Sequence, residues 1–242
     1  PEREARLAWT PAERNSVREA SEAGGVAIGG LCLSLHRRIA PGSNDPAMRE
    51  RAIEVLTRGI DFCADLHIPV LQLAGYFAYY EDAPADARDG YVHCLRMGAE
   101  YAARKGVLLG IENVDGTDIT SIEAAMDVVE AVGSPWLQLY PDLGNIAEQG
   151  LPMVGELRRG RGHMLALHAK DVRRGEPRRV PMGRGRAGGS WSCWSRSNPA
   201  GPGGAGAVPA EAHRWAPASR SRPQPLPGST MPSAWPAPAG GW

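Results

Sequence analysis

Three polar residues that can bind a metal ion recur at similar intervals in the middle of the chain. They are Glu112, Asp142 and His168, which lie 30 and 26 residues apart. Two carboxylates and an imidazole suit Zn²⁺, Mn²⁺ or a similar divalent ion, and open positions on such an ion can take the oxygens of a substrate. Any one of these residues could equally cap a strand or pair locally. Three of them in register favour a metal centre.

The segments around these residues alternate between short apolar runs and amphipathic stretches. This pattern is typical of parallel strands that are connected by crossover helices. The predicted strands are residues 26–35, 69–74, 107–112, 137–140 and 164–169. Because the carboxyl ends of parallel strands meet at one edge of the sheet, the three candidate ligands are expected to lie together at this rim.

Helix signals fall between the predicted strands. One helix is expected to begin at Pro46, with Asp45 or the asparagine before it as N-cap. Another is expected to begin at a capping-box pattern in residues 120–123 and to end at Gly133. The remaining predicted helices are residues 11–23 and 87–104. The fold class is therefore α/β, and since a closed barrel takes eight strands, the five visible strands predict either an open sheet or a TIM (β/α) barrel that is incomplete.

The composition limits the kind of partner that the chain can bind. The 27 basic and 27 acidic residues balance, which argues against a nucleic acid or a membrane surface as partner. The apolar runs are shorter than the roughly 18 residues that a membrane helix needs. The 4 cysteines form no CxxC pair, and no secretory segment is evident at the start. These features predict a cytoplasmic protein with a small-molecule partner.

The last part of the chain differs in composition from the rest. Residues 184–242 contain ten prolines, ten glycines and five of the 7 tryptophans, but no lysine, aspartate, isoleucine, phenylalanine or tyrosine. Such a segment does not build an ordinary core. We therefore divide the chain into a domain of residues 1–183 and a low-complexity tail of residues 184–242. The tail is interpreted either as a natural disordered segment or, the favoured hypothesis, as an out-of-frame translation of a GC-rich gene.

Several segments before the tail carry a family resemblance. In order along the chain they read LCLSLHRR, VLQLAGY, IENVD, WLQLYPDLGN and LHAKD. Together they closely resemble the L-ribulose/L-xylulose 5-phosphate 3-epimerases, also described as hexulose-6-phosphate isomerase-like enzymes, of the xylose-isomerase-like barrel superfamily. The resemblance covers about residues 5–183. It implies an isomerase that uses a divalent metal, Zn²⁺ or Mn²⁺, to epimerise a ketopentose phosphate at C3, as in pentose or ascorbate breakdown.

The resemblance also implies roles for the three rim residues. The family's catalytic and metal-binding glutamate falls on Glu112, its aspartate ligand on Asp142 and its histidine ligand on His168. A fourth ligand, a glutamate in a pattern like IEMW, has no counterpart, and the first strand and helix of the family barrel are not recognised at the start. Inversion at C3 needs an acid on each face of the sugar. We therefore expect this chain to have severely reduced activity.

Other residues near the predicted rim are candidates for contacts with the substrate. His36 and Arg37 follow a predicted strand and could receive a phosphate through charge-assisted hydrogen bonds. A solvated basic loop is an equally good interpretation of this pair. The candidates for hydrogen bonds to sugar hydroxyls are Gln72, Asn145, Lys170 and Asp171.

The sequence is also compatible with two functions other than that of an epimerase. The chain could be a catalytically inactive remnant or a sugar-phosphate-binding protein, which the absence of the final glutamate favours. A metal-dependent endonuclease acting at abasic sites shares the barrel, but would be expected to show more histidine ligands and a basic groove. The sequence leaves open the sugar (L-xylulose or L-ribulose 5-phosphate, or a hexulose 6-phosphate), the metal and the oligomeric state, of which a homodimer is one possibility.

Overall fold

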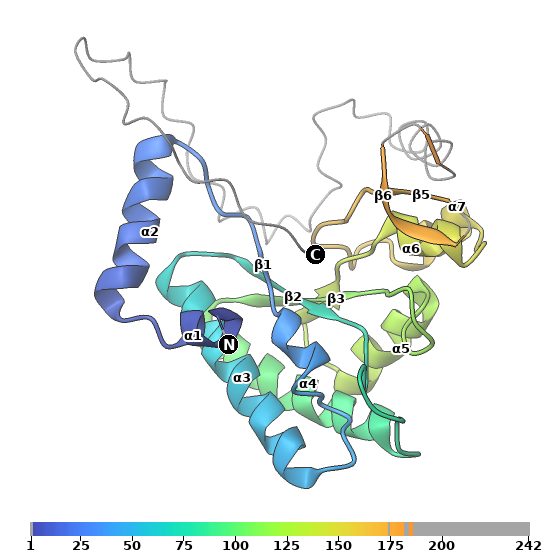
Figure 1. Ribbon diagram of the computed structural model, residues 1–242, viewed down its shortest axis with the longest axis horizontal. Coiled ribbons are helices and arrows are strands. Elements are labelled where there is room, and N and C mark those ends of the chain that lie inside the picture. The colour runs from blue at the N-terminus through green and yellow to red at the C-terminus, as the bar shows by residue number, and fades with distance from the viewer. Residues whose placement is uncertain (1, 174, 182–183, 186–242) are drawn as a thin grey trace.

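A parallel sheet of four strands forms the centre of the protein in the computed structural model, which describes residues 2–173, 175–181 and 184–185. The strands lie side by side in the order in which they occur in the chain (Figure 1). They are β1 (Leu31–Cys32), β2 (Val70–Ala74), β3 (Leu108–Glu112) and β4 (Leu137–Leu139). The carboxyl ends of all four strands therefore meet at one edge.

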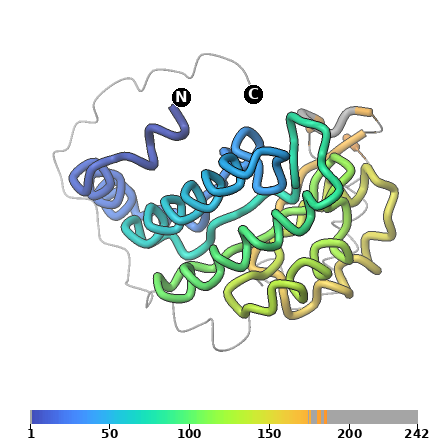
Figure 2. Tube along the Cα trace, turned by 90° about the horizontal axis from the view of Figure 1, so that it is seen from below, coloured from blue at the N-terminus to red at the C-terminus, as the bar shows by residue number. Residues whose placement is uncertain are grey.

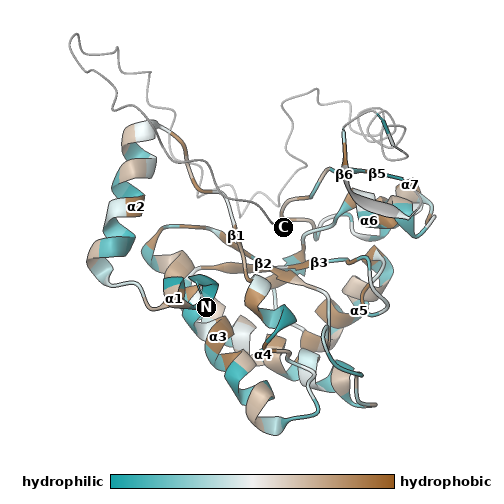
Figure 3. Ribbon diagram, in the orientation of Figure 1, coloured by the Kyte–Doolittle hydropathy of each residue, from teal (hydrophilic) through white to brown (hydrophobic). Residues whose placement is uncertain are grey.

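Helices cover one face of this sheet. Figure 2 shows three of them side by side, in accordance with their contacts: α3 (Pro46–Asp65), α4 (Ala87–Lys105) and α5 (Ile122–Val132). The N-terminal segment forms α1 (Glu2–Leu7) and α2 (Pro11–Gly24), and α2 has no buried residue and is hydrophilic along much of its length (Figure 3). The remaining elements are η1 (Ser34–Arg37), α6 (Leu143–Glu148), α7 (Met153–Arg159), β5 (Asp171–Arg173) and β6 (Glu176–Val180). None of the helices in the described ranges has the length and apolar content needed to cross a membrane.

The two faces of the sheet carry different side chains. Successive residues of a strand point to opposite faces. On β2 and β3 one set is aliphatic and belongs to the main core with the helices: Leu71, Leu73, Leu109 and Ile111. The alternate set includes Gln72 and Glu112, which therefore point to the face away from the helices. In a barrel this face is the interior, where substrates bind at the carboxyl rim.

The outer two predicted strands are shorter than expected. Only Leu31 and Cys32 of the segment 26–35 pair with β2. The residues before Gly30 lie opposite Pro69, which has no N–H to donate, and the residues before it, and after Cys32 the chain turns into η1. The segment 164–169 makes two isolated parallel bridges, Leu139 with Met164 and Asp142 with His168, instead of a continuous ladder. The boundary at 183 and nearly all of the segment 184–242 lie outside the described residues, so the division into two domains stays a prediction.

Local capping signals place the helices correctly. The Asp45 carboxylate accepts a hydrogen bond from the Ala47 N–H at 2.9 Å, and Pro46 opens α3 as predicted. The cap of α5 differs from the predicted box: Ser121, not the residue before it, is the N-cap, and its hydroxyl accepts from Ala124 N–H at 3.0 Å. Helix α5 ends at Gly133 with φ 68°, in the left-handed region that favours glycine.

A carboxylate from another helix completes the cap of α5. Glu156 of α7 is only 2% exposed, and its Oε2 accepts a hydrogen bond from Ile122 N–H at 2.7 Å. Its other oxygen accepts from Arg159 at 3.2 Å. The free N–H groups at a helix start and the helix dipole both favour a negative charge there. Glu156 therefore joins α5 to α7.

Replacing Glu156 by alanine is expected to lower the free energy of unfolding by about 1–3 kcal/mol, since the buried N–H of Ile122 loses its acceptor. Urea unfolding followed by circular dichroism measures this change. Glu130→Ala, an exposed position on the same helix α5, is the matched control and should change the midpoint little. Equal midpoints for the two variants would show that the carboxylate does not hold α5 in place.

Candidate metal centre

The three predicted ligands come together at the carboxyl rim of the sheet. One ligand atom from each of Glu112, Asp142 and His168 lies within 4.8 Å of the other two. Glu112 is the last residue of β3, and Asp142 and His168 face each other across the bridge that follows β4. Parallel strands that end at the same level thus bring together residues that are far apart in the sequence.

Hydrogen bonds fix the orientation of each ligand. His168 Nδ1 lies 2.6 Å from Glu112 Oε1 and 3.9 Å from Asp142 Oδ2. The other oxygen of Glu112 accepts a hydrogen bond from the Gln72 amide. Asp142 Oδ1 caps α6 by accepting from Asn145 N–H at 3.0 Å, which leaves Oδ2 facing the cluster. Each carboxylate therefore has one oxygen held by Gln72 or Asn145 and one directed towards His168, and the latter oxygen of Asp142 also lies 3.1 Å from Lys170 Nζ.

Burial and charge shift the titration of two of these groups. Burial raises the pKa of Asp142, and the Lys170 ammonium, whose Nζ lies 3.1 Å from Oδ2, opposes that rise. The hydrogen bond with Glu112 raises the pKa of His168. Two buried carboxylates beside an imidazole are a donor set that fits a divalent cation.

An asparagine that the sequence reasoning did not single out holds the rim together. Asn113 is 1% exposed; its amide donates to the Asp142 carbonyl at 3.1 Å and accepts from the Asp142 N–H at 2.7 Å. Its own carbonyl accepts from Asn145 at 2.8 Å. The signal for Asn113 was its place directly after Glu112 in the IEN segment, where a polar residue leaves the strand.

Of the predicted sugar contacts, three are engaged with other parts of the protein: Asn145, Lys170 and Asp171. The Asn145 amide accepts from Lys170 Nζ at 2.6 Å, so that Lys170 bridges Asn145 and Asp142. Gly144 makes room for this side chain, because a Cβ at Gly144 would lie 2.4 Å from Lys170 Cγ. Asp171 is 1% exposed, and its Oδ2 accepts from Gly185 N–H at 2.8 Å. This geometry favours structural roles for Asn145, Lys170 and Asp171.

The two predicted phosphate contacts differ in their surroundings. The Arg37 guanidinium lies over two aromatic rings, with its central carbon 5.3 Å from the centre of Tyr76 and 5.5 Å from that of Tyr79. His36 is 2% exposed, and its Nε2 lies 3.1 Å from the carbonyl oxygen of Ala52. Burial lowers the pKa of His36 to about 4. The structure therefore argues against a charged His36 in contact with a phosphate.

The pKa of His36 gives the protein a pH-dependent stability. Because this pKa falls from 6.5 to about 4 on folding, the unfolded chain binds the extra proton between these pH values. The contribution of His36 is thus fully present above pH 6.5 and is lost as the pH falls, by about 2 kcal/mol near pH 4.5. The free energy of unfolding, measured with urea at pH 7 and at pH 4.5, should fall between these two pH values by about 2 kcal/mol less in His36→Leu than in the unaltered chain. The same pH dependence in both proteins would contradict the lowered pKa of His36.

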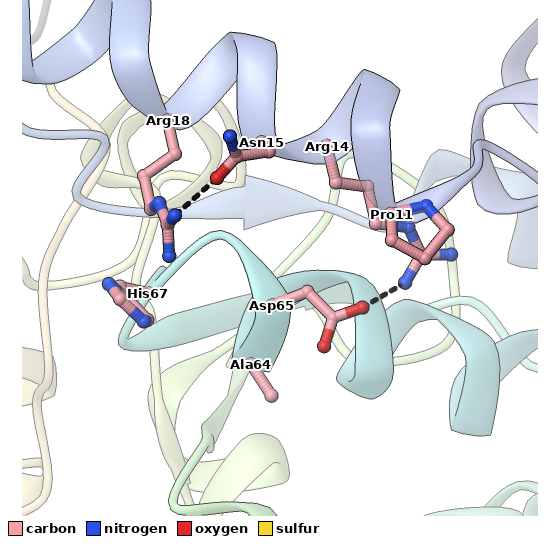
Figure 4. Close-up of a pocket in the computed structure, with 7 residues that line it drawn as sticks. All are labelled: Pro11, Arg14, Asn15, Arg18, Ala64, Asp65 and His67. Atoms are coloured by element: carbon pink, nitrogen blue, oxygen red, sulfur yellow. Dashed lines mark hydrogen bonds and ion pairs between the residues drawn. The ribbon is translucent and has the colours of Figure 1, made fainter.

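A pocket of about 410 Å³ lies at the other end of the sheet, near the turn that leads into β2 (Figure 4). Arg14 spans it from α2, donating to Asp65 at 2.5 Å and to two backbone carbonyls. Arg18 donates to Asn15 on its own helix. The Arg14–Asp65 ion pair joins α2 to the last residue of α3, and the pocket is therefore assigned to the contact between these helices and not to an active site. Its lining residues are Pro11, Arg14, Asn15, Arg18, Ala64, Asp65 and His67.

Parallel strands with helices on one face, and a carboxylate–imidazole cluster at the carboxyl rim that could hold a metal ion, are typical of the (β/α)-barrel class. Residues 1–191 match the family model "Xylose isomerase-like TIM barrel". The chain belongs to this family.

Relatives with assigned names are similar to most of this chain. The L-ribulose-5-phosphate 3-epimerase UlaE proteins of Shigella flexneri and Shigella sonnei are 38% identical to it over 184 residues, which is 76% of this chain. The chain spans 65% of the length of these relatives.

Solved structures support the fold. A D-psicose 3-epimerase crystallised in the presence of D-fructose has a TM-score of 0.64 and 17% identity, over 74% of this chain and 63% of the other. An L-ribulose 3-epimerase has a TM-score of 0.58 and 18% identity, over 64% of this chain and 54% of the other. At such identities the likeness concerns the fold alone, and it confirms the predicted α/β barrel class.

Proposed function

We propose that this chain is a sugar-phosphate 3-epimerase of the isomerase class, which uses Glu112 to remove the proton at C3 of a ketopentose phosphate. The observation that carries the proposal is the cluster of Glu112, Asp142 and His168 at the carboxyl rim. The names of the relatives that are 38% identical supply the substrate class, L-ribulose 5-phosphate or its C3 epimer. Carboxylates, rather than a basic groove, surround the centre, which favours a sugar over DNA.

The three side chains are proposed to hold Zn²⁺ or Mn²⁺. When bound, the ion supplies Lewis-acid polarisation of the carbonyl beside C3. Asp142 and His168 keep their positions because the backbone around them is bonded: His168 N–H donates to the Pro141 carbonyl at 2.8 Å, and Asn113 holds both backbone groups of Asp142. The site is therefore arranged before the ligand arrives, which lowers the cost of binding.

Glu112 is proposed as the base. Its Oε1 is the oxygen that faces His168, whereas the bond from Gln72 holds Oε2. Proton removal at C3 leaves an enediolate, and return of a proton to the opposite face gives the epimer. That second transfer needs another acid. Among the residues that the structure describes, the cluster contains one glutamate, so we propose exchange of the C3 proton as the step that these residues perform, with epimer formation impaired.

Arg37 is the residue that we propose for the phosphate. It is partly buried, and its guanidinium is stacked on tyrosine rings in the loop after β2. Guanidinium groups bind phosphate through paired charge-assisted hydrogen bonds. A cytoplasmic location and a homodimer are further predictions that accompany the proposed function, and the sequence does not choose between Zn²⁺ and Mn²⁺. An inactive sugar-phosphate-binding protein is the second candidate, favoured by the single glutamate of the described cluster.

Incubation with L-ribulose 5-phosphate in heavy water tests the proposal. With Mn²⁺ or Zn²⁺ added, deuterium is expected to enter C3, and a chelator should stop its uptake. Nuclear magnetic resonance measures both deuterium at C3 and formation of the xylulose epimer. Binding of the sugar phosphate without any exchange would favour the binding-protein alternative, and the absence of both would contradict the two candidates together.

A further inference from the structure

Gln72 is a buried polar residue beside Glu112, and only part of its side chain is used to hold that carboxylate. It lies in the middle of β2, in register with Cys32 on β1 and Gly110 on β3, and is 3% exposed. Its side chain reaches diagonally to the carboxylate of Glu112 at the end of β3. A polar side chain this deep in the sheet needs partners for all its polar atoms.

The chemistry of the neighbour fixes the orientation of the Gln72 amide. An ionised carboxylate only accepts hydrogen bonds, so the amide must present its NH₂ group to Glu112. Nε2 accordingly donates to Glu112 Oε2. The two atoms of an amide diverge from one carbon, so Oε1 is turned away from this carboxylate.

Oε1 of Gln72 is buried and accepts no hydrogen bond from the residues that the structure describes. Burying an amide oxygen without a hydrogen-bond donor destabilises the fold, because the hydrogen bonds that it would make to water are not replaced. The hydrogen bonds of the described residues leave this acceptor open: Glu112 takes the bond from Nε2, and the Lys170 ammonium is held by Asn145 and Asp142. A molecule that enters the site can supply the missing donor.

We propose that Gln72 is a specificity-determining residue whose Oε1 accepts a hydrogen bond from a hydroxyl group of the substrate. This inference rests on the proposed function and names the recognition that the function needs. One amide group would then bind the Glu112 carboxylate through Nε2 and the hydroxyl through Oε1. A single residue would then hold the base in place and orient the sugar carbon that the base faces.

A hydrogen-bonding site discriminates strongly against a ligand that lacks the hydroxyl, since the buried acceptor is again left alone. The probes are L-ribulose 5-phosphate and its 1-deoxy, 3-deoxy and 4-deoxy analogues, and their dissociation constants are measured by calorimetry with the Mn²⁺-loaded chain. One analogue is expected to bind about five- to a hundredfold more weakly than the parent sugar. In Gln72→Met, which removes the acceptor at similar volume, that difference should shrink to less than about twofold.

Gln138→Met is the matched control, because both amide atoms of this strand glutamine already have protein partners, the Pro135 carbonyl at 3.1 Å and His163 at 2.9 Å. It should keep the full discrimination. Gln72→Leu serves as a second variant if thermal unfolding shows that the methionine variant is not folded. Two results would overturn this inference but not the proposed function. In the first, the folded Gln72 variant discriminates against the deoxy analogue as strongly as the unaltered chain; in the second, the unaltered chain binds all the analogues as tightly as the parent sugar. If the unaltered chain does not bind the parent sugar phosphate, the proposed function fails as well.

Discussion

Replacing Glu112 by glutamine is expected to slow deuterium uptake at C3 of L-ribulose 5-phosphate by about a hundredfold to ten-thousandfold, the usual contribution of a general base. The amide keeps the size of the side chain but does not take a proton. The new NH₂ group must also point towards either Gln72 or His168, each of which is hydrogen-bonded to an oxygen of Glu112 in the unaltered chain. Exchange measured by nuclear magnetic resonance in heavy water follows the effect.

The control for this variant is Glu100→Gln, which makes the same chemical change at an exposed position of α4. Its exchange rate should equal that of the unaltered chain. If Glu112→Gln also exchanged the C3 proton at the original rate, another group would be the base. The cluster would then have to be assigned to metal binding alone.

Replacing Asp142 by asparagine is expected to weaken Mn²⁺ binding by about a hundredfold or more. Mutation of a residue that only hydrogen-bonds to a metal ligand already lowers the affinity by about ten- to a hundredfold, and loss of a ligand should cost at least as much. The asparagine oxygen can still cap α6, so the effect should come from the lost charge and not from unfolding. In this variant Lys170, 3.1 Å from Asp142 in the structure, has no carboxylate opposite it and repels the cation.

Titration with Mn²⁺ followed by electron paramagnetic resonance measures this affinity. Asp127→Asn, on the exposed side of α5, is the matched control and should bind the ion as the unaltered chain does. Equal affinities for the two variants would exclude Asp142 as a ligand, and a large drop in both would point to a general loss of the fold.

Much of the fold could be predicted because its signals are local. The side chain of Asp45 and the ring of Pro46 fix the start of α3 without help from distant residues, and Gly133 ends α5 where the backbone turns left-handed. The apolar runs of β2 and β3 are buried on both faces, as parallel strands are. Their spacing also brings the ends of successive strands to one rim, which is why the cluster of three could be found in advance.

The partners of individual side chains could not be predicted in this way. Glu156 caps a helix 34 residues before it, a contact that only the packing of α7 on α5 creates. His36 looked like part of a basic loop with Arg37, yet the turn of η1 buries it beside the carbonyl of Ala52. Lys170 is held by Asn145 because Gly144 leaves space for it. Contacts of this kind depend on the tertiary fold and carry no signal in sequence spacing.

Glu112, Asp142 and His168 are proposed to hold one divalent ion together. A crystal of the chain grown with Mn²⁺, with diffraction recorded at the manganese absorption edge, tests this most directly. One anomalous peak is expected at the carboxyl rim, directly coordinated by an oxygen of each carboxylate and by a nitrogen of His168. A peak elsewhere, or ligand atoms that stay bonded to one another around an empty centre, would contradict it.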